Sequence, residues 1–383
     1  MRIAIALTNP NILGGGNKFT SDLCQMLKKY DHKLALCSFE KPNEQSFEGL
    51  HEAENVFTPS FIGNHIKGTV WKTLLTAGSA IKKCIKEFNP DLIISADLEP
   101  GAFFSVPDNI YKIHYCHFPT ELKIRKNTYL YLIYRIPYWY QHYKQLSRLD
   151  YVICNSNYTE KIAKILWGNY VKMDTFRTIY PTVDINKFNV KKEKKNQLCY
   201  VGRIDSFKGI DYVIDSYINL YDDYKCDLKI VGGVSKKIES ILYANKITKR
   251  VDELKNKSYP IEIKTNVSYN EIIDTLVSSK ILLSYNPEEH FGIVPIEAQA
   301  AGCVPIVADG GGQQETVIHN VTGFRMSNPN DFTKYVKQLM TNNLLYQQMS
   351  EQGKYWAKSF SMEEVGLKWN NLLLEIDEKK NQR

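Results

Sequence analysis

Two glutamates, Glu289 and Glu297, are separated by seven residues in a segment that could bind a hydroxyl-rich or phosphorylated ligand. Residues 281–285 predict a buried strand that leads into this segment, and residues 297–301 predict a helix that ends at Gly302. One glutamate should therefore lie on a loop and the other just inside a helix. Both face the carboxyl edge of a parallel sheet, where open α/β sheets bind ligands. Backbone N–H groups at a helix start also suit phosphate or sugar oxygens.

The same segment contains the motifs Glu289-x-Phe291-Gly292, Pro295-x-Glu297-Ala298 and Ala301-Gly302-x-x-Pro305-Ile306. Together these motifs resemble the signature of the retaining glycosyltransferases of family 4. It implies an α/β chain with the GT-B fold, in which two Rossmann-like domains with parallel sheets face each other across a cleft and a C-terminal helix returns to the first domain. We expect an acceptor-side domain at 1–190, completed by a helix at about 361–383, and a nucleotide-sugar domain at 196–360.

The resemblance assigns donor-binding roles within this segment. Glu297 would accept the ribose hydroxyls, and Glu289 would act at the hydroxyls of the donor sugar. Backbone N–H groups would contact sugar or phosphate at Phe291, Gly292 and Ile293.

A second motif, Val201-Gly202-Arg203 followed by Lys208-Gly209, also resembles family 4. There, two such cations hold the diphosphate of the donor. Loss of a nucleoside diphosphate places negative charge on the β-phosphate, and fixed cations stabilise that charge in the transition state. No metal-binding Asp-x-Asp motif is present, so neither a cofactor nor a divalent metal is expected.

Two further segments resemble those that contact the nucleotide in family 4 enzymes. Residues 228–231 predict a strand that ends in a tight turn at Gly232. Residues 261–265 predict another strand, and from Lys264 to Val267 the chain corresponds to where the family reads the base, largely with main chain. Uracil and guanine are therefore equally compatible with the sequence.

The first half of the chain carries a glycine-rich turn and a histidine. Gly15 and Gly16 follow a predicted strand at 3–7 and open a helix, an arrangement that lets backbone approach a phosphate. His117 directly follows a predicted strand at 112–116, and Pro119 forces an extended turn beside it. In family 4 a histidine here contacts the donor sugar, and His-aromatic-Pro-Thr further resembles the Alg11-type mannosyltransferases of lipid-linked oligosaccharide assembly. Near the expected linker at 191–195, Thr182 stands where the family has glycine.

Residues 123–148 combine basic and aromatic side chains on a predicted helix interrupted by Pro137. The residues are Lys123, Arg125, Lys126, Arg135, Lys144 and Arg148 with Tyr129, Tyr131, Tyr134, Tyr138, Trp139, Tyr140 and Tyr143. Such a stretch can lie at a membrane interface, stack on single-stranded nucleic acid, or simply pack on its own domain.

Composition narrows the possibilities further. The 383 residues suggest two domains, and the net charge of +7 indicates mild attraction to anions. Eight scattered cysteines without a Cys-x-x-Cys pair predict buried thiols in a reducing compartment. No run is apolar enough for a signal peptide or a spanning helix, so we expect a cytoplasmic protein that can associate with the cytoplasmic face of a membrane.

The sequence therefore predicts a glycosyltransferase that moves a hexose from a GDP- or UDP-sugar to a hydroxyl of a glycan or lipid-linked acceptor. Mannose and glucose are the favoured hexoses. One alternative is a sugar-nucleotide epimerase of similar fold, which would act on donor alone. Another is a nucleic-acid-binding protein that uses 123–148, whose affinity would fall steeply with salt. We favour the transferase and expect no nucleic-acid partner.

Overall fold

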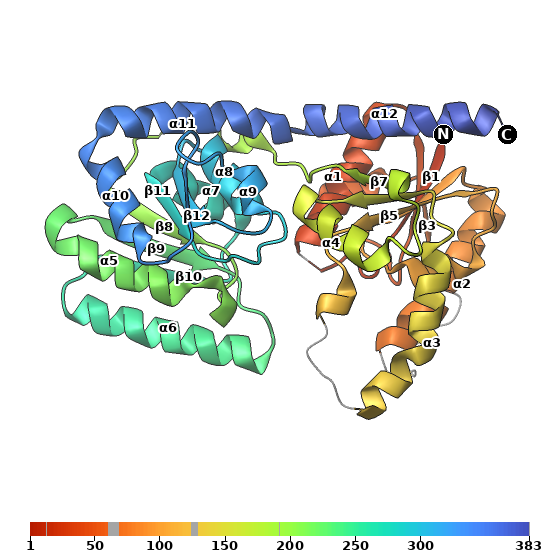
Figure 1. Cartoon of the computed structure of the whole chain (residues 1–383), viewed down its shortest axis with the longest axis horizontal. Helices are drawn as coiled ribbons and strands as arrows, with labels where there is room; N and C mark the ends of the chain where they lie inside the picture. Colours follow the sequence, from red (N-terminus) through yellow and green to blue (C-terminus); the bar gives the residue numbers. More distant parts are fainter. Residues whose placement is uncertain (13, 60–68, 124–128, 191, 383) are drawn as a thin grey trace. The chain divides into compact units, whose positions relative to one another are not determined.

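The computed structural model describes residues 1–12, 14–59, 69–123, 129–190 and 192–382. The chain divides into two compact units (Figure 1). The first unit comprises Met1–Thr182 with Met362–Arg383, and the second unit comprises Val183–Ser361. Each unit contains one parallel sheet with helices on both faces, which is the Rossmann-like arrangement that the alternation of strands and helices predicts.

The sheet of the first unit has seven parallel strands in the order β3-β2-β1-β4-β5-β6-β7. The strands are β1 (Arg2–Ala6), β2 (Lys33–Cys37), β3 (Asn55–Phe57), β4 (Leu92–Ser95), β5 (Tyr111–Cys116), β6 (Tyr151–Cys154) and β7 (Phe176–Thr178). Most are almost entirely buried, as expected for strands covered on both faces, although β5 includes the polar residues Lys112 and His114. Strand order reverses between β1 and β4, and such a reversal opens a crevice at the carboxyl ends.

Helices cover both faces of this sheet. They are α1 (Gly15–Lys29), α2 (Thr69–Phe88), α3 (Tyr129–Leu146), α4 (Asn157–Trp167) and α12 (Met362–Asn381). α1 and α12 pack together on one face, where Phe19, Leu23 and Trp369 join the same buried cluster as the strands. The return of the last helix to the first unit is therefore confirmed. α2, α3 and α4 contribute to the cluster on the opposite face.

The second unit has six parallel strands in the order β10-β9-β8-β11-β12-β13. They are β8 (Gln197–Val201), β9 (Asp227–Gly232), β10 (Ile261–Thr265), β11 (Ile281–Ser284), β12 (Val304–Ala308) and β13 (Phe324–Met326). Strand order reverses between β8 and β11, so this sheet also has one switch point.

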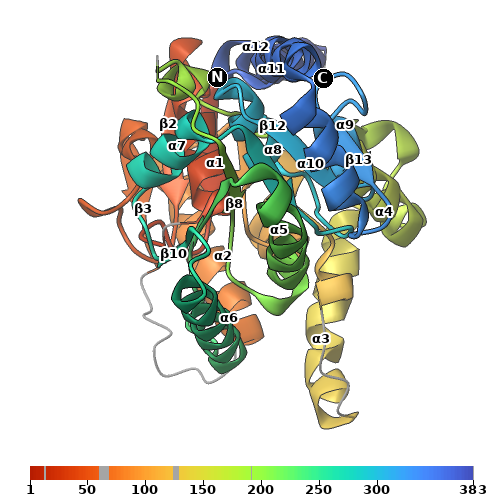
Figure 2. The same ribbon diagram turned by 90° about the vertical axis from the view of Figure 1, so that its left-hand side faces the viewer.

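The main helices of the second unit surround that sheet. They are α5 (Ile210–Tyr224), α6 (Ile238–Asn256), α7 (Tyr269–Ser278), α8 (Ile293–Ala300), α9 (Gln313–Thr316), α10 (Asp331–Thr341) and α11 (Asn343–Ala357). α5 and α6 lie along one face of the sheet, and α7, α8 and α11 lie along the other (Figures 1 and 2).

Several side chains differ from what local sequence suggested. Arg135 and Tyr138, expected at an interface, are 6% and 4% exposed because their side of α3 packs on the first unit. Lys194 was expected in a solvated linker. Its ammonium instead donates hydrogen bonds to the carbonyl oxygens of Leu276 and Ser279, which anchors the side chain on the second unit. Thr182 is also buried, and its hydroxyl donates to Asp22 on α1 at 2.8 Å.

The prediction of buried thiols is confirmed, since all eight cysteines are buried and free. Among the described helices, none is long and apolar enough to cross a membrane. Within the described ranges, no group of three or more His, Cys, Asp or Glu side chains could hold a metal ion.

Candidate active site

The switch point of the second unit brings together residues that are far apart in sequence. Gly202 and Arg203 follow β8, Glu289 lies on the loop after β11, and Gly232 ends β9. Gly232 packs directly on Gly202, because a Cβ built on Gly232 would lie 1.6 Å from the Gly202 carbonyl oxygen. Only glycine permits this backbone approach, which keeps the two neighbouring loops at one edge of the sheet.

The two predicted diphosphate-binding cations occupy one neighbourhood. Arg203 and Lys208 both lie against the ring of Phe207, with the guanidinium carbon 5.3 Å and the ammonium 5.5 Å from its centroid. The two side chains differ in exposure: that of Arg203 is 62% exposed and that of Lys208 is 14% exposed. Arg203 can therefore reorient toward a ligand, whereas Lys208 is held in place.

Glu289 is what holds Lys208. The ammonium donates to Glu289 Oε2 at 2.5 Å, and the Asn286 side-chain amide donates to the same oxygen at 2.9 Å. Burial alone would raise the pKa of Glu289, but the Lys208 ammonium and the Asn286 amide hold it below its ordinary value. The carboxylate is thus ionised at neutral pH, with a cation and an amide converging on it.

α8 begins beside this ion pair. Gly292 precedes the helix in the left-handed conformation with φ of 97°, which favours glycine, and Ile293 is the first helical residue. The side chain of Phe291 is 3% exposed and packs against Phe360, so only its backbone can serve a ligand. The first N–H groups of a helix have no partner within that helix and are suited to sugar or phosphate oxygens.

Glu297 lies one turn further along α8 and is only 7% exposed. Its Oε1 accepts a hydrogen bond from the hydroxyl of Tyr269 at 2.8 Å. Sequence reasoning missed Tyr269 and Asn286, since nothing in their local pattern marks them as neighbours of the two glutamates.

The end of β10 reaches the same edge of the sheet. Lys264 forms an ion pair with Glu271 at 2.7 Å, so its ammonium supports α7. Val267 follows Asn266, whose backbone N–H donates to the Gly232 carbonyl at 2.7 Å and whose side chain accepts from the Val234 N–H. These bonds fix the main chain around Val267.

His117, Gly15 and Gly16 belong to the first unit. Gly15 and Gly16 are the first residues of α1, and a Cβ on Gly16 would lie 3.8 Å from His117 Nε2. His117 Nε2 lies 2.9 Å from the Ala96 carbonyl oxygen, so this nitrogen is the protonated donor. The structure therefore brings the predicted histidine and glycine together at the carboxyl edge of the sheet.

A carboxyl that sequence reasoning missed lies at the switch point of the first unit. Asp97 follows β4 and accepts hydrogen bonds from the Thr8 backbone at 2.7 Å and from the Thr8 hydroxyl at 2.5 Å. Burial raises the pKa of Asp97, although the bonds from Thr8 oppose that shift. Asp97 and His117 thus lie at the carboxyl ends of the neighbouring strands β4 and β5.

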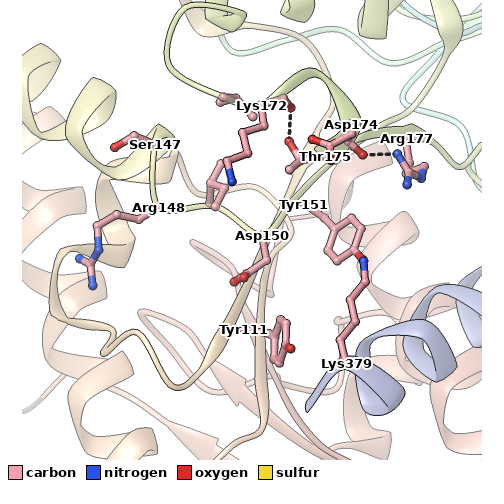
Figure 3. A pocket seen from close by; sticks show the side chains of 12 residues that line it. Tyr111, Ser147, Arg148, Asp150, Tyr151, Lys172, Asp174, Thr175, Arg177 and Lys379 are labelled. Carbon is pink, nitrogen blue, oxygen red and sulfur yellow. Dashed lines mark hydrogen bonds between the residues drawn. The ribbon is translucent and has the colours of Figure 1, made fainter. Parts of the chain in front are cut away.

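A separate hollow of about 380 Å³ lies at the amino ends of β5, β6 and β7 (Figure 3). It is lined by cations, Arg148, Lys172, Arg177 and Lys379 among them, but also by Asp150 and Asp174. Parallel strands place His117 at their opposite ends, so this hollow is distinct from the candidate active site.

Comparison with known proteins identifies the class. The family model described as Glycosyltransferase Family 4 matches residues 13–187, and the model described as Glycosyl transferases group 1 matches residues 183–356. A crystal structure of a glycosyltransferase from Rickettsia africae has 19% identity and a TM-score of 0.74, over 98% of each chain. The fold and the matched models define a GT-B glycosyltransferase. The model named for family 4 covers residues 13–187, so over this part the chain is similar to glycosyltransferase family 4.

Curated relatives narrow the resemblance. The chain is 25% identical to α-1,3/1,6-mannosyltransferase alg-2 of Neurospora crassa, over 91% of this chain and 85% of that protein. It is 26% identical to human ALG2, over 64% of this chain and 63% of that protein, so the match spans less than two thirds of the human relative. These relatives are of the ALG2 type rather than the Alg11 type that the segment around His117 suggested.

Proposed function

We propose that this enzyme transfers mannose from a nucleoside diphosphate sugar to a hydroxyl of a glycan or lipid-linked acceptor, with retention of configuration. Glucose is the second candidate sugar, and GDP or UDP the candidate carrier. The observation that carries this proposal is the Lys208–Glu289 ion pair beside Arg203 at the switch point of the second unit. The preference for mannose rests on the mannosyltransferase relatives.

The site supports chemistry based on charge. As the bond between the sugar C1 and the β-phosphate oxygen breaks, Lys208 and Arg203 stabilise the negative charge that develops on the phosphate. A bond forms between C1 and the acceptor oxygen on the same face, and the acceptor proton passes to the leaving phosphate. The cations take the place of a divalent metal in this proposal.

The remaining groups hold the donor. Glu297 accepts the ribose hydroxyls, Glu289 faces the hydroxyls of the transferred sugar, and the α8 N–H groups contact sugar or phosphate. Main chain around Val267 reads the base. In the first unit, His117 with Gly15 and Gly16 provides contacts for the sugar or the acceptor.

A binding panel tests this assignment. GDP, UDP, GDP-mannose and UDP-glucose are titrated calorimetrically into the wild-type protein, Glu297→Ala and the control Glu253→Ala, an exposed position on α6. Losing one charge-assisted hydrogen bond, roughly 1.5–3 kcal/mol, should weaken the preferred nucleotide about 10- to 100-fold in Glu297→Ala alone. Unchanged affinity in Glu297→Ala would contradict the assignment. Epimer formation from donor alone would favour the epimerase instead.

We also propose peripheral contact with an anionic membrane surface through α3. Part of 123–148 lies outside the described residues, but Ile133, Ile136 and Tyr140 are 46%, 60% and 64% exposed. Their spacing places them on one side of the helix, and the Lys144 ammonium lies over the Tyr140 ring. Figures 1 and 2 show α3 projecting from the body of the first unit. Exposed apolar groups flanked by a cation suit the boundary of an anionic bilayer, here a cytoplasmic face.

Vesicle sedimentation tests this contact. Wild-type protein should bind vesicles that contain an anionic phospholipid more strongly than neutral vesicles, and Ile136→Glu with Tyr140→Glu should abolish the difference. The matched control is Leu344→Glu with Tyr355→Glu, two positions that are 72% and 71% exposed on the second unit. Equal binding by both double variants would contradict the proposal.

A further inference from the structure

Tyr269 connects the base side of the candidate donor site to its ribose side. It is the first residue of α7, shortly after the end of β10, and its hydroxyl donates to Glu297 Oε1 on α8 at 2.8 Å. The two residues are 28 positions apart in the sequence. Because Glu297 is only 7% exposed, a hydrogen-bond donor that it loses is not readily replaced by water.

The position of Tyr269 is determined by contacts other than this hydrogen bond. Its ring meets the ring of Phe188 edge-on, with 6.4 Å between centroids, and the Lys187 ammonium lies 5.8 Å from the Tyr269 centroid. Ser268 caps α7 by accepting from the Glu271 N–H. The hydroxyl is therefore presented to Glu297 by a ring and a helix start that are already fixed.

We propose that Tyr269 is a positioning residue that orients the Glu297 carboxylate to accept the ribose hydroxyls of the nucleotide. The inference rests on the proposed function of Glu297. A hydrogen bond to a carboxylate limits its rotation and favours its charged form, and both effects lower the cost of binding a diol. Tyr269 thereby makes affinity depend on an intact ribose without touching the reacting atoms.

This role has a signature that a merely structural role lacks. Arg203 and Lys208, the proposed diphosphate ligands, lie in the segment after β8 rather than on α7. Loss of the Tyr269 hydroxyl should therefore weaken the ribose contact and leave the phosphate contact intact. Ribose contacts do not change during sugar transfer, so KM should rise while kcat stays constant.

The test compares GDP and UDP with their 2′,3′-dideoxy forms by calorimetry. Tyr269→Phe keeps the ring and its contacts with Phe188 and Lys187 while removing only the hydroxyl. We expect Tyr269→Phe to bind the preferred nucleotide about tenfold more weakly, and the dideoxy form within about twofold of wild type. Tyr355→Phe, which changes an exposed tyrosine in the same unit, should match wild type for both ligands.

The outcomes separate this inference from the function on which it rests. If Glu297→Ala binds the nucleotide normally, the donor assignment is wrong. If Glu297→Ala weakens binding but Tyr269→Phe does not, the donor assignment stands and the role of Tyr269 is wrong. If Tyr269→Phe weakens the ribose and dideoxy forms equally, or lowers kcat with KM unchanged, Tyr269 does not act through the ribose.

Discussion

Replacing Lys208 with methionine tests the site most directly, because it removes one cation and keeps most of the side-chain volume. If the Lys208 ammonium stabilises charge that develops on the leaving phosphate, kcat should fall by roughly 10²–10³, which corresponds to about 2.7–4 kcal/mol. Lys208→Arg, which keeps the charge, should retain more activity than Lys208→Met.

The Lys208→Met substitution also lowers the free energy of unfolding, and the structure bounds the size of this loss. Glu289 loses its partner, and its side chain is 27% exposed, between a fully buried pair and a surface pair. We therefore expect a loss of about 1–3 kcal/mol in the free energy of unfolding. For a domain stable by roughly 5–15 kcal/mol, this leaves most molecules folded. A hundredfold loss of rate would then reflect catalysis rather than unfolding.

The assay measures initial rates of sugar transfer at saturating donor, together with the urea unfolding midpoint of each variant. Lys337→Met is the matched control, since Lys337 is an exposed lysine on α10 of the same unit. A Lys208→Met enzyme that folds and turns over within about threefold of wild type would refute the role of Lys208 in leaving-group stabilisation.

Two further predictions concern stability. The pKa of Glu289 is held below its ordinary value of 4.5, so its contribution is full above that value and is lost as pH falls through the lower folded pKa. Glu289→Gln should therefore unfold about 1–2 kcal/mol more easily than wild type at pH 7, and urea titrations should show that the gap narrows below about pH 4; a gap independent of pH would argue against the ion pair. Gly232→Ala should lower the melting temperature by several degrees, equivalent to about 2 kcal/mol or more, because its Cβ would overlap the Gly202 carbonyl. Gly233→Ala, whose Cβ would meet nothing within 4 Å, is its control, and equal melting temperatures would contradict the close approach.

Local sequence sufficed for the elements that carry the site. The apolar run of β4 predicts a buried strand, the residue pattern of β5 also predicts a strand, and His117 directly follows β5 in the sequence. A local pattern is formed by Gly292, which precedes α8, and the glutamates on either side of it. This pattern was enough to predict their position at a strand-to-helix turn. In these cases the information lies within a few residues of the chain.

Only the tertiary structure decided which of these side chains meet. Lys208 and Glu289 are 81 positions apart, and they pair because β8 and β11 are neighbours in the sheet. The contact of Tyr269 with Glu297 likewise depends on how α7 and α8 lie against one another. The burial of Arg135 and the anchoring of Lys194 on backbone carbonyls show the same limit, since sequence alone predicts that such charged side chains face solvent. Strand order and helix packing are set by the summed burial of the whole chain, so no short pattern specifies these partners.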